Sequence, residues 1–500
     1  MLYQSTRNKN VLVKSADAIK LGIAPDGGLF VPQEKVKLSP AHIMNFSEMN
    51  YNARAVEILK LFLTDFTQDE IKECVDKAYN KDKFETENIA PVYKLNDSVY
   101  FLELWHGPTC AFKDMALQIL PHLLTKAVLK TGEDKEVVIL VATSGDTGKA
   151  ALEGFKDVEG TRIIVFYPDN GVSEIQKLQM ITQEGQNVGV CAVEGNFDDA
   201  QNGVKAIFTD SAYNDLLEKY NFRLSSANSI NWGRLVPQII YYFSAYADLL
   251  KNEEIKEGEK INIVVPTGNF GNILAAYYAK EMGLPVNKLI CASNENNVLT
   301  EFIRTGVYDR NREFRTTLSP SMDILISSNL ERLLFDVTGH DDLRVKQWMQ
   351  ELKETGRYEV HDITKQKIKE IFWAGYCDDE ATSQTIKETE MNYSYVIDTH
   401  TAVAKNVYDQ YARETGDNTK TVIASTASPF KFNQSVLMAL AGEEEIQGKS
   451  EFELLEILAE KSGLRIPKSL SQLKDKAILH NIKCKKEEME KVVNRMLQLE

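Results

Sequence analysis

The chain has 500 residues, 43% of them hydrophobic, and a formal net charge of −15. This length predicts two to four domains, and the composition supplies a sizeable core and argues against wholesale disorder. The acidic balance argues against non-specific nucleic-acid binding, although a local basic pocket for an anion is compatible with it.

The cysteines and histidines indicate neither a disulfide framework nor a metal site. The six cysteines contain no C-x-x-C pair, and the seven histidines are scattered along the chain. This pattern is typical of a reducing compartment. No apolar run follows Met1, and no segment approaches the ~20 apolar residues of a membrane-spanning helix. We therefore expect a cytoplasmic protein without a membrane partner.

Residues 1–98 are predicted to form an N-terminal, mostly helical domain. Apolar side chains recur at helical spacing over residues 53–63 and 68–79. A turn-rich stretch at residues 24–32 contains two glycines and enters a short strand. Nothing in this region by itself requires a chemical role.

A lysine at a strand-to-helix turn is the first candidate for chemistry. Residues 106–114 read HGPTCAFKD, and they follow a strand-like run and precede a helix-like segment. Lys113 lies beside Phe112 and Met115, so part of its stem is expected to be buried. Burial favours the neutral amine, which is the form that attacks a carbonyl. An ion-paired or snorkelling lysine is the alternative, and the flanking residues alone favour it.

Residues 130–221 are predicted to form a small α/β domain. Continuous apolar strands alternate here with helices, which is the pattern of a parallel sheet covered on both faces. Strands are expected at 137–142, 162–167 and 187–193, and helices at 148–155, 173–184 and 198–208.

A larger α/β domain is predicted over residues 99–129 and 222–435. Its elements are expected at 99–104, 261–265, 289–292 and 421–424 (strands), 273–282 (helix) and 230–250 (a helix interrupted at Pro237). Residues 300–420 are interpreted as helical cover and insertions. Residues 436–500 are predicted to be a C-terminal helical extension.

Polar loops follow several of these strands, where open parallel sheets bind ligands. Residues 266–272, PTGNFGN, combine two glycines with the start of a helix. Backbone N–H groups and the helix dipole there suit a phosphate without a lysine. The loop lacks the P-loop pattern and the third glycine of a dinucleotide fingerprint. A plain glycine turn is the alternative.

Two further loops suit anions. Residues 142–148, ATSGDTG, carry hydroxyls and amides that suit a carboxylate, with a helix N-cap as the alternative. Residues 228–234, NSINWGR, place an arginine among amides and a hydroxyl, which suits a second phosphate. The alternative there is an ordinary helix start with Arg234 in a salt bridge.

The remaining polar features are less specific. Residues 425–432, STASPFKF, offer hydroxyls to the hydrogen-bonding edge of a ligand, or they merely begin a turn. His106 and His400 have no further metal ligands nearby in the sequence, so both are interpreted as structural or supporting residues. No metal site is expected.

Together these motifs resemble the threonine synthase family of fold-type II pyridoxal-phosphate enzymes. The matching segments lie at residues 3–7, 24–29, 106–114, 143–148, 228–234 and 268–271. The resemblance implies an α/β architecture of two open, mostly parallel, twisted sheets, with pyridoxal 5′-phosphate in the cleft between them and helical extensions at both ends. It implies a lyase that converts O-phospho-L-homoserine and water to L-threonine and phosphate. We expect a monomer or homodimer.

The resemblance also implies a role for each matching residue. Lys113 would be the Schiff-base lysine, Thr426 would contact the pyridine nitrogen, and Asp146 would lie near the cofactor's 3-hydroxyl. The cofactor phosphate would be held by Gly268, Asn269, Phe270, Gly271 and Asn272. The substrate carboxylate would be received by Ser144, Gly145 and Thr147, and the substrate phosphate by Asn228, Ser229 and Arg234. Asn272 replaces an aspartate that is frequent in the family, which should matter little if backbone amides bind the phosphate.

Other functions remain open at this stage. A threonine-synthase-like phospho-lyase would keep both anion sites and fail only to add water. An amino-acid dehydratase on the same fold would have little use for Arg234 with Asn228 and Ser229. A non-catalytic, anion-binding regulator is the third alternative, and an intact Lys113 argues against it. Closure of the small domain over the large one is expected to exclude water early in the reaction.

Overall fold

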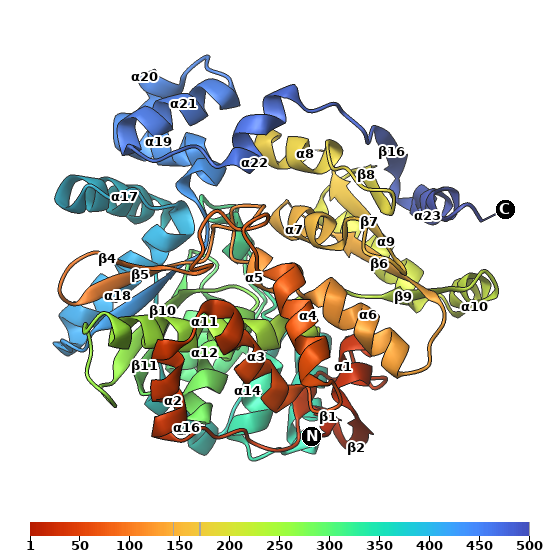
Figure 1. The fold of residues 1–500 in the computed structure, drawn as a ribbon, viewed down its shortest axis with the longest axis horizontal. Helices are drawn as coiled ribbons and strands as arrows, with labels where there is room; N and C mark the ends of the chain where they lie inside the picture. Colours follow the sequence, from red (N-terminus) through yellow and green to blue (C-terminus); the bar gives the residue numbers. More distant parts are fainter. Residues whose placement is uncertain (144, 170–171, 500) are drawn as a thin grey trace.

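Two parallel sheets form the centre of the molecule (Figure 1). The computed structural model describes residues 1–143, 145–169 and 172–499. Alternating strands and helices build both sheets, and helical segments flank them at the two ends of the chain. The fold is therefore the α/β architecture of two open, mostly parallel sheets that the sequence predicts.

The larger sheet has the strand order β14-β11-β10-β15-β5-β4. Its neighbouring strands are parallel, except that the edge strand β4 runs antiparallel to β5. The strands are β4 (Val92–Lys94), β5 (Val99–Glu103), β10 (Ile261–Pro266), β11 (Val286–Ser293), β14 (Phe372–Tyr376) and β15 (Thr421–Ser425). The central strands β5, β10 and β15 are buried throughout, which explains their continuous apolar sequences.

Helices cover both faces of the larger sheet. In β10, Ile263 and Val265 belong to the core shared with α11 (Trp232–Lys251) and α12 (Gly271–Met282), and Val264 belongs to the core on the opposite face. This alternation follows from the two-residue period of a strand. The opposite face is covered by α17 (Asp379–Tyr393) and α18 (Thr399–Thr415).

The smaller sheet has the order β16-β8-β7-β6-β9, and all of its strands are parallel. Its strands are β6 (Glu136–Ala142), β7 (Thr161–Pro168), β8 (Val188–Glu194), β9 (Phe222–Ser225) and β16 (Ile482–Lys485). Its helices are α7 (Asp146–Phe155) and α8 (Glu174–Ile181) on one face, and α9 (Phe197–Thr209), α10 (Ser211–Lys219) and α23 (Met489–Leu497) on the other.

The N-terminal region adds a small antiparallel sheet to its helices. Its elements are β1 (Tyr3–Ser5), β2 (Asn8–Val13), α1 (Ser15–Leu21), β3 (Phe30–Pro32), α2 (Pro40–Asn45), α3 (Tyr51–Phe62) and α4 (Gln68–Ala78). The helices α5 (Asp114–Leu117) and α6 (Leu120–Lys130) then lead into the smaller sheet. The side chains of α3 and α4 join the same hydrophobic core as α11, so this region is packed onto the larger unit.

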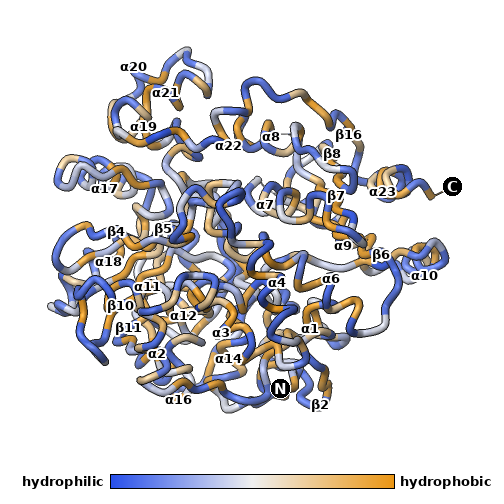
Figure 2. The backbone as a smooth tube through the Cα atoms, in the orientation of Figure 1, coloured by the Kyte–Doolittle hydropathy of each residue, from blue (hydrophilic) through white to orange (hydrophobic). Residues whose placement is uncertain are grey.

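The remaining elements lie around the larger sheet or in the C-terminal part of the chain. They are α13 (Val298–Thr305), β12 (Val307–Asp309), α14 (Leu330–Val337), α15 (Asp342–Thr355), β13 (Arg357–Glu359), α16 (Asp362–Ile371), α19 (Asn433–Ala441), α20 (Glu443–Ile446), α21 (Glu451–Ser462) and α22 (Lys468–Ser471). Figure 2 shows hydrophobic segments along the strands, whereas many outer turns are hydrophilic. Within the described ranges, no helix is long and apolar enough to cross a membrane.

Several expectations about individual segments are wrong. Helix α11 continues through Pro237 without a break, because burial on nearly every side outweighs the one backbone hydrogen bond that proline removes. The region 300–420 is more than cover, since β14 forms one edge of the larger sheet. The C-terminal segment is not only helical, since β16 pairs with β8. The smaller sheet also extends past residue 221, through β9.

Candidate active site

Lys113 lies at the start of α5, directly after the turn that leaves β5. The turn is tied to the segment after β15: Phe112 N–H donates to the Thr426 carbonyl (2.8 Å), and Ala111 forms an isolated bridge with Ala427. Two neighbouring strands of the larger sheet therefore fix the position of this lysine. Thr426, the residue expected at the pyridine nitrogen, is buried beside the same turn.

The shape of this turn depends on Asp114, whose side chain is fully buried. Its two oxygens accept from the Thr109 N–H (2.8 Å) and the Thr109 hydroxyl (2.7 Å). Burial raises the pKa of Asp114 to about 6. A Cβ on Gly107 would lie 2.6 Å from Asp114, so only glycine allows this close approach. The contacts of Asp114 with Thr109 and Gly107 thus hold the turn around Lys113 in shape without a ligand.

The Lys113 amine is largely buried, with its side chain 12% exposed. Its Nζ lies 3.0 Å from the Ser321 hydroxyl and 3.5 Å from Asp146 Oδ2. Burial lowers the pKa of Lys113, and the positive charges of Lys431 and Arg234 act in the same direction against the attraction of Asp146. A lowered pKa favours the neutral amine that a nucleophile or a general base requires.

Asp146 is the only carboxylate that the described residues bring to Lys113 Nζ within ion-pair distance. Asp146 is the first residue of α7, which follows strand β6 of the smaller sheet. Its contact with Lys113 therefore connects the smaller sheet to the larger one at the site. Its Oδ1 accepts from Lys431 (2.9 Å) and from the Gln176 amide (2.8 Å). Burial alone would raise the pKa of Asp146, but Lys431 and Lys113 hold it well below its usual range. The carboxylate therefore stays ionised.

Lys431 is a second buried lysine that the sequence did not single out. Its side chain is fully buried, and Nζ also donates to the Thr109 carbonyl at 2.7 Å. Lys431 lies within the polar run after β15, but its neighbours Phe430 and Phe432 suggest only a half-buried turn. Nothing in that local pattern indicates a contact with Asp146.

The loop before α12 has the backbone form that suits a phosphate. Phe270 takes a left-handed conformation (φ 64°) at the helix N-terminus, and its ring is buried with the centroid 5.7 Å from that of Phe372. Phe270 can therefore offer a ligand only its backbone. The Asn272 side chain accepts from Thr267 (2.6 Å) and donates to the Pro266 carbonyl (2.9 Å). The Asn272 side chain thus stabilises the loop through hydrogen bonds to two other residues of the same loop.

Gly268 and Asn269 in this loop touch a segment that the sequence analysis treated as an insertion. A Cβ on Gly268 would lie 3.2 Å from the backbone of Ser321 and Met322. The Asn269 carbonyl accepts from Asn329, whose side chain also donates to the Ser229 carbonyl (3.3 Å). Asn329 therefore joins the loop before α12 to the loop before α11. Gly271 begins α12 and is buried.

The loop before α7 is organised around one hydroxyl. Thr143 Oγ1 accepts from the N–H groups of Gly145 (3.0 Å) and Gly148 (2.9 Å). These bonds tie the first turn of α7 to Thr143, although the N-cap position itself is Gly145 and carries no side-chain cap, and Thr147 is half-buried in that turn. Ser144, a predicted carboxylate ligand, lies outside the described residues.

Arg234 is buried without an acidic partner among the residues that the structure describes. One of its terminal nitrogens donates to the Ala227 carbonyl at 2.7 Å, and its Nε has no hydrogen-bond partner in the same part of the chain. Burial lowers the pKa of Arg234 to about 10. The salt-bridge alternative for this arginine is thus absent. Ser229 is half-buried and Asn228 is exposed on the loop that Arg234 holds.

The two predicted supporting histidines differ in their relation to the site. His106 hydrogen-bonds to Glu103 (2.7 Å) and stacks on Trp105. His400 is 3% exposed and accepts the Ser321 N–H on Nε2 at 3.2 Å. It therefore reaches the neighbourhood of Lys113 through Ser321. Groups of three or more metal-ligating side chains do not occur within the described ranges.

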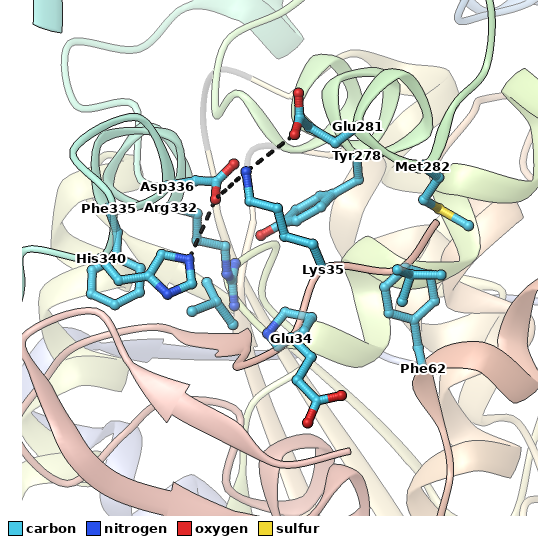
Figure 3. A pocket seen from close by; sticks show the side chains of 13 residues that line it. Glu34, Lys35, Phe62, Tyr278, Glu281, Met282, Arg332, Phe335, Asp336 and His340 are labelled. Carbon is cyan, nitrogen blue, oxygen red and sulfur yellow. Dashed lines mark hydrogen bonds and ion pairs between the residues drawn. The ribbon is translucent and has the colours of Figure 1, made fainter. Parts of the chain in front are cut away.

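An enclosed cavity elsewhere in the molecule does not belong to this site. Figure 3 shows it between the N-terminal segment, α12 and α14. Lys35 bridges Glu281 (3.1 Å) and Asp336 (3.3 Å) across it, and His340 lies 3.4 Å from Asp336. Its volume of about 30 Å³ has room for about two water molecules. The cavity is therefore too small for a substrate.

The charges at the site fit a phosphorylated aldehyde cofactor. Asp146 pairs with two buried lysines, Lys113 and Lys431, and the buried Arg234 adds a third positive charge that acts on Lys113. Such a surplus of buried positive charge requires anions. An amine with a lowered pKa and a helix N-terminus supply the two groups that pyridoxal 5′-phosphate needs, one for its aldehyde and one for its phosphate.

Comparisons with known proteins agree with this assignment. Family models match three consecutive parts of the chain: Threonine synthase N terminus at residues 2–79, Pyridoxal-phosphate dependent enzyme at 84–361, and Threonine synthase, C-terminal at 401–477.

Curated relatives and solved structures cover most of the chain. Threonine synthase-like 1 of Homo sapiens is 41% identical over 85% of this chain, which spans only 58% of that protein's length. Threonine synthase of Saccharomyces cerevisiae is 37% identical, with 88% of this chain and 89% of that protein covered. A crystal structure of PLP-bound threonine synthase from Brucella melitensis matches with a TM-score of 0.88, 34% identity and full coverage of both chains.

Proposed function

The chain belongs to the threonine synthase family of pyridoxal-phosphate-dependent enzymes, and from this premise we propose that it converts O-phospho-L-homoserine and water to L-threonine and phosphate. Its cofactor is pyridoxal 5′-phosphate. One observation carries the choice of a phosphorylated substrate, namely the buried Arg234 that lacks an acidic partner among the described residues. A buried guanidinium in this state needs an anion in addition to the cofactor phosphate.

Lys113 has two roles in this proposal. It attaches the cofactor, and its amine is the base that removes the proton from the substrate's α-carbon and later returns protons to the carbon chain. When bound, the cofactor supplies an electron sink for the negative charge at the α-carbon. The low pKa of Lys113 keeps the amine available for this work.

The other residues bind and orient. Gly268, Asn269, Phe270, Gly271 and Asn272 would hold the cofactor phosphate through backbone N–H groups, and Asp146 would face the cofactor's 3-hydroxyl. Thr426 would offer a hydroxyl to the ring nitrogen. Because a hydroxyl stabilises a protonated ring less than a carboxylate does, more of the charge stabilisation would fall to positioned cations.

Two groups of residues would receive the substrate. Ser144, Gly145 and Thr147 would bind its carboxylate at the N-terminus of α7, and Asn228, Ser229 and Arg234 would bind its phosphate. The contact of Asn329 with both the cofactor-phosphate loop and the substrate-phosphate loop supports a fixed spacing between the two anions.

We also propose a domain division with closure during the reaction. The divisions are an N-terminal domain at 1–98, a large domain at 99–129 and 222–435, a small domain at 130–221 and a C-terminal extension at 436–500, with β9 and β16 completing the sheet of the small domain. Asp146 comes from the smaller sheet and Lys113 from the larger, so a relative movement of the two would open or close the site. Substrate analogues should then reduce protease sensitivity and the radius of gyration in small-angle scattering. Unchanged values would remove this support.

A phospho-lyase that releases 2-oxobutyrate is the second candidate. The 41% identity to human Threonine synthase-like 1 supports this candidate, because that protein's name does not assign water addition. The proposed setting is the cytoplasm, and the proposed form is a monomer or homodimer. Both rest on the sequence pattern alone.

Substrate choice tests the proposal. The purified holoenzyme is incubated with O-phospho-L-homoserine and, separately, with L-threonine. We expect inorganic phosphate and threonine from the first substrate and no deamination of the second. Deamination of L-threonine without phosphate release from the phosphoester would favour a dehydratase and overturn the proposal.

A further inference from the structure

A hydroxyl group contacts both residues at the centre of the site. Ser321 Oγ lies 3.0 Å from Lys113 Nζ and 3.1 Å from Asp146 Oδ2, whereas Lys113 and Asp146 are 3.5 Å apart. We propose that Ser321 is a further catalytic residue, which orients the reacting amine of Lys113 and keeps it 3.5 Å from Asp146. This inference rests on the proposed role of Lys113 as the base.

The direction of each hydrogen bond follows from the groups involved. A carboxylate only accepts and an ammonium only donates, whereas a hydroxyl does both. Ser321 therefore donates its O–H to Asp146 and accepts an N–H from Lys113. This arrangement fixes one N–H direction of the amine and hence the direction of its remaining N–H bonds or lone pair. A base that must face a carbon atom gains from such an orientation.

His400 holds Ser321 in place from behind. The Ser321 N–H can only donate, so Nε2 of His400, 3.2 Å away, must be the acceptor. The hydrogen of the ring then lies on Nδ1, which donates to Asp398 Oδ2 at 2.8 Å. Asp398 is fully buried and also accepts the N–H groups of His400 (2.9 Å) and Thr401 (3.1 Å). The contacts of His400 with Ser321 and with Asp398 thus fix the tautomer and the position of the His400 ring.

A second set of contacts holds the segment from its other end. Asp323, two residues after Ser321, accepts from the Thr317 N–H (3.0 Å) and from the side chains of Asn294 (2.7 Å) and Asn296 (3.0 Å). The loop at Gly268 packs against the Ser321 backbone on a third side. Ser321 is therefore positioned by three independent parts of the chain, which is typical of a preorganised site residue.

The charge balance explains why the separation matters. Asp146 attracts a proton to Lys113, and Lys431 and Arg234 oppose it. Without the Ser321 hydroxyl, the amine is free to move closer to Asp146 than the present 3.5 Å and to strengthen that ion pair. An ion pair holds the amine as ammonium, which cannot accept a proton from carbon. His400 and Asp398 are positioning residues in this account, because they act on the amine only through Ser321.

The test measures the Lys113 amine directly in the full-length protein after the cofactor has been removed. Trace labelling with acetic anhydride across about pH 7 to 11, read by mass spectrometry of the Lys113 peptide, reports the protonation of this amine. We expect Ser321→Ala to shift the labelling midpoint upward by about half a unit or more, which is about a threefold loss of reactivity at neutral pH. Ser321→Thr keeps the hydroxyl and should restore the wild-type profile.

Two His400 variants separate positioning from simple destabilisation. Gln at position 400 retains an acceptor for the Ser321 N–H, and Leu does not. His400→Leu should reproduce the shift of Ser321→Ala, and His400→Gln should show a smaller one. In the holoenzyme, Ser321→Ala should lower kcat more than tenfold with KM within about twofold of wild type.

An unchanged Lys113 labelling profile in Ser321→Ala would overturn the inference, as would an unchanged kcat. The labelling result is independent of the product formed. If the enzyme makes no threonine but Ser321→Ala shifts the profile, the proposed function fails and the contact between Ser321 and Lys113 stands.

Discussion

Lys431 Nζ lies 2.9 Å from Asp146 Oδ1, so a second buried lysine shares the carboxylate that lies beside Lys113. The two lysines come from the segments after β15 and β5, which are neighbours in the larger sheet, and Asp146 comes from the smaller sheet. The contact therefore joins the two sheets and sets the protonation of the site at the same time.

Replacing Lys431 with methionine should strongly destabilise the protein. Removal of one partner leaves a buried charge with less compensation, which typically costs about 3–5 kcal/mol of the free energy of unfolding. Urea denaturation of the two holoproteins measures the difference. The control is Lys72→Met, which breaks an exposed pair with Asp76 and should cost less than about 1 kcal/mol. Similar losses for the two variants would contradict the structural role of Lys431.

Replacing Lys113 with alanine should abolish both turnover and the visible absorbance of the bound cofactor. The amine that attaches the cofactor and acts as base is then missing. Lys431→Met should keep the absorbance band, because Lys431 is a buried cation without the attachment role. Threonine production by Lys113→Ala would rule out the assigned base.

Replacing Arg234 with alanine should chiefly weaken binding of the phosphorylated substrate. Truncation of one member of a buried, hydrogen-bonded charge pair costs about 2–5 kcal/mol. Steady-state kinetics should show a large rise in KM for O-phospho-L-homoserine. The exposed Arg357 forms a salt bridge with the exposed Glu359, so Arg357→Ala is the matched control and should behave as wild type. An unchanged KM in Arg234→Ala would argue against the phosphate site.

The pH dependence of stability should carry a contribution from Asp114. Its folded-state pKa is raised by burial from 3.8 to about 6. The stability that it contributes is thus fully present below its unfolded pKa and is lost as the pH rises through about 6. This shift corresponds to about 3 kcal/mol between the two limits. Asp114→Asn removes the titration, so the difference between wild type and variant should change in that direction between the two pKa values.

Denaturant midpoints of wild type and Asp114→Asn at several acidic pH values measure this difference. Other carboxylates, Asp146 among them, contribute with the opposite sign, and the subtraction cancels them if the variant folds alike. A difference that stays constant with pH would show that Asp114 titrates normally.

Much of the fold follows from local sequence patterns. The strands β6, β7 and β8 of the smaller sheet are continuous apolar runs, so they were predicted almost to their ends. The segments β14 and β16 were missed because short edge strands take their conformation from a partner far away in the chain. Local propensity carries little information about such pairings.

The residues of the site likewise divide into those that local sequence predicts and those that it does not. The segment around Lys113 and the glycine loop before α12 carry strong local motifs, and the structure places Lys113 beside Asp146. Ser321 lies 208 residues from Lys113 in the sequence, in the short 3-10 helix Pro320–Met322. The segment SPSMD at residues 319–323 has no extended helical or strand period, so the sequence carried no local signal that places Ser321 beside Lys113.

The most direct test of the central claim is the ratio of threonine to phosphate released from O-phospho-L-homoserine. The account predicts equal amounts of L-threonine and inorganic phosphate, because each elimination is followed by water addition on the same enzyme. Release of phosphate with 2-oxobutyrate and ammonia, and without threonine, would contradict the account and make the enzyme a phospho-lyase.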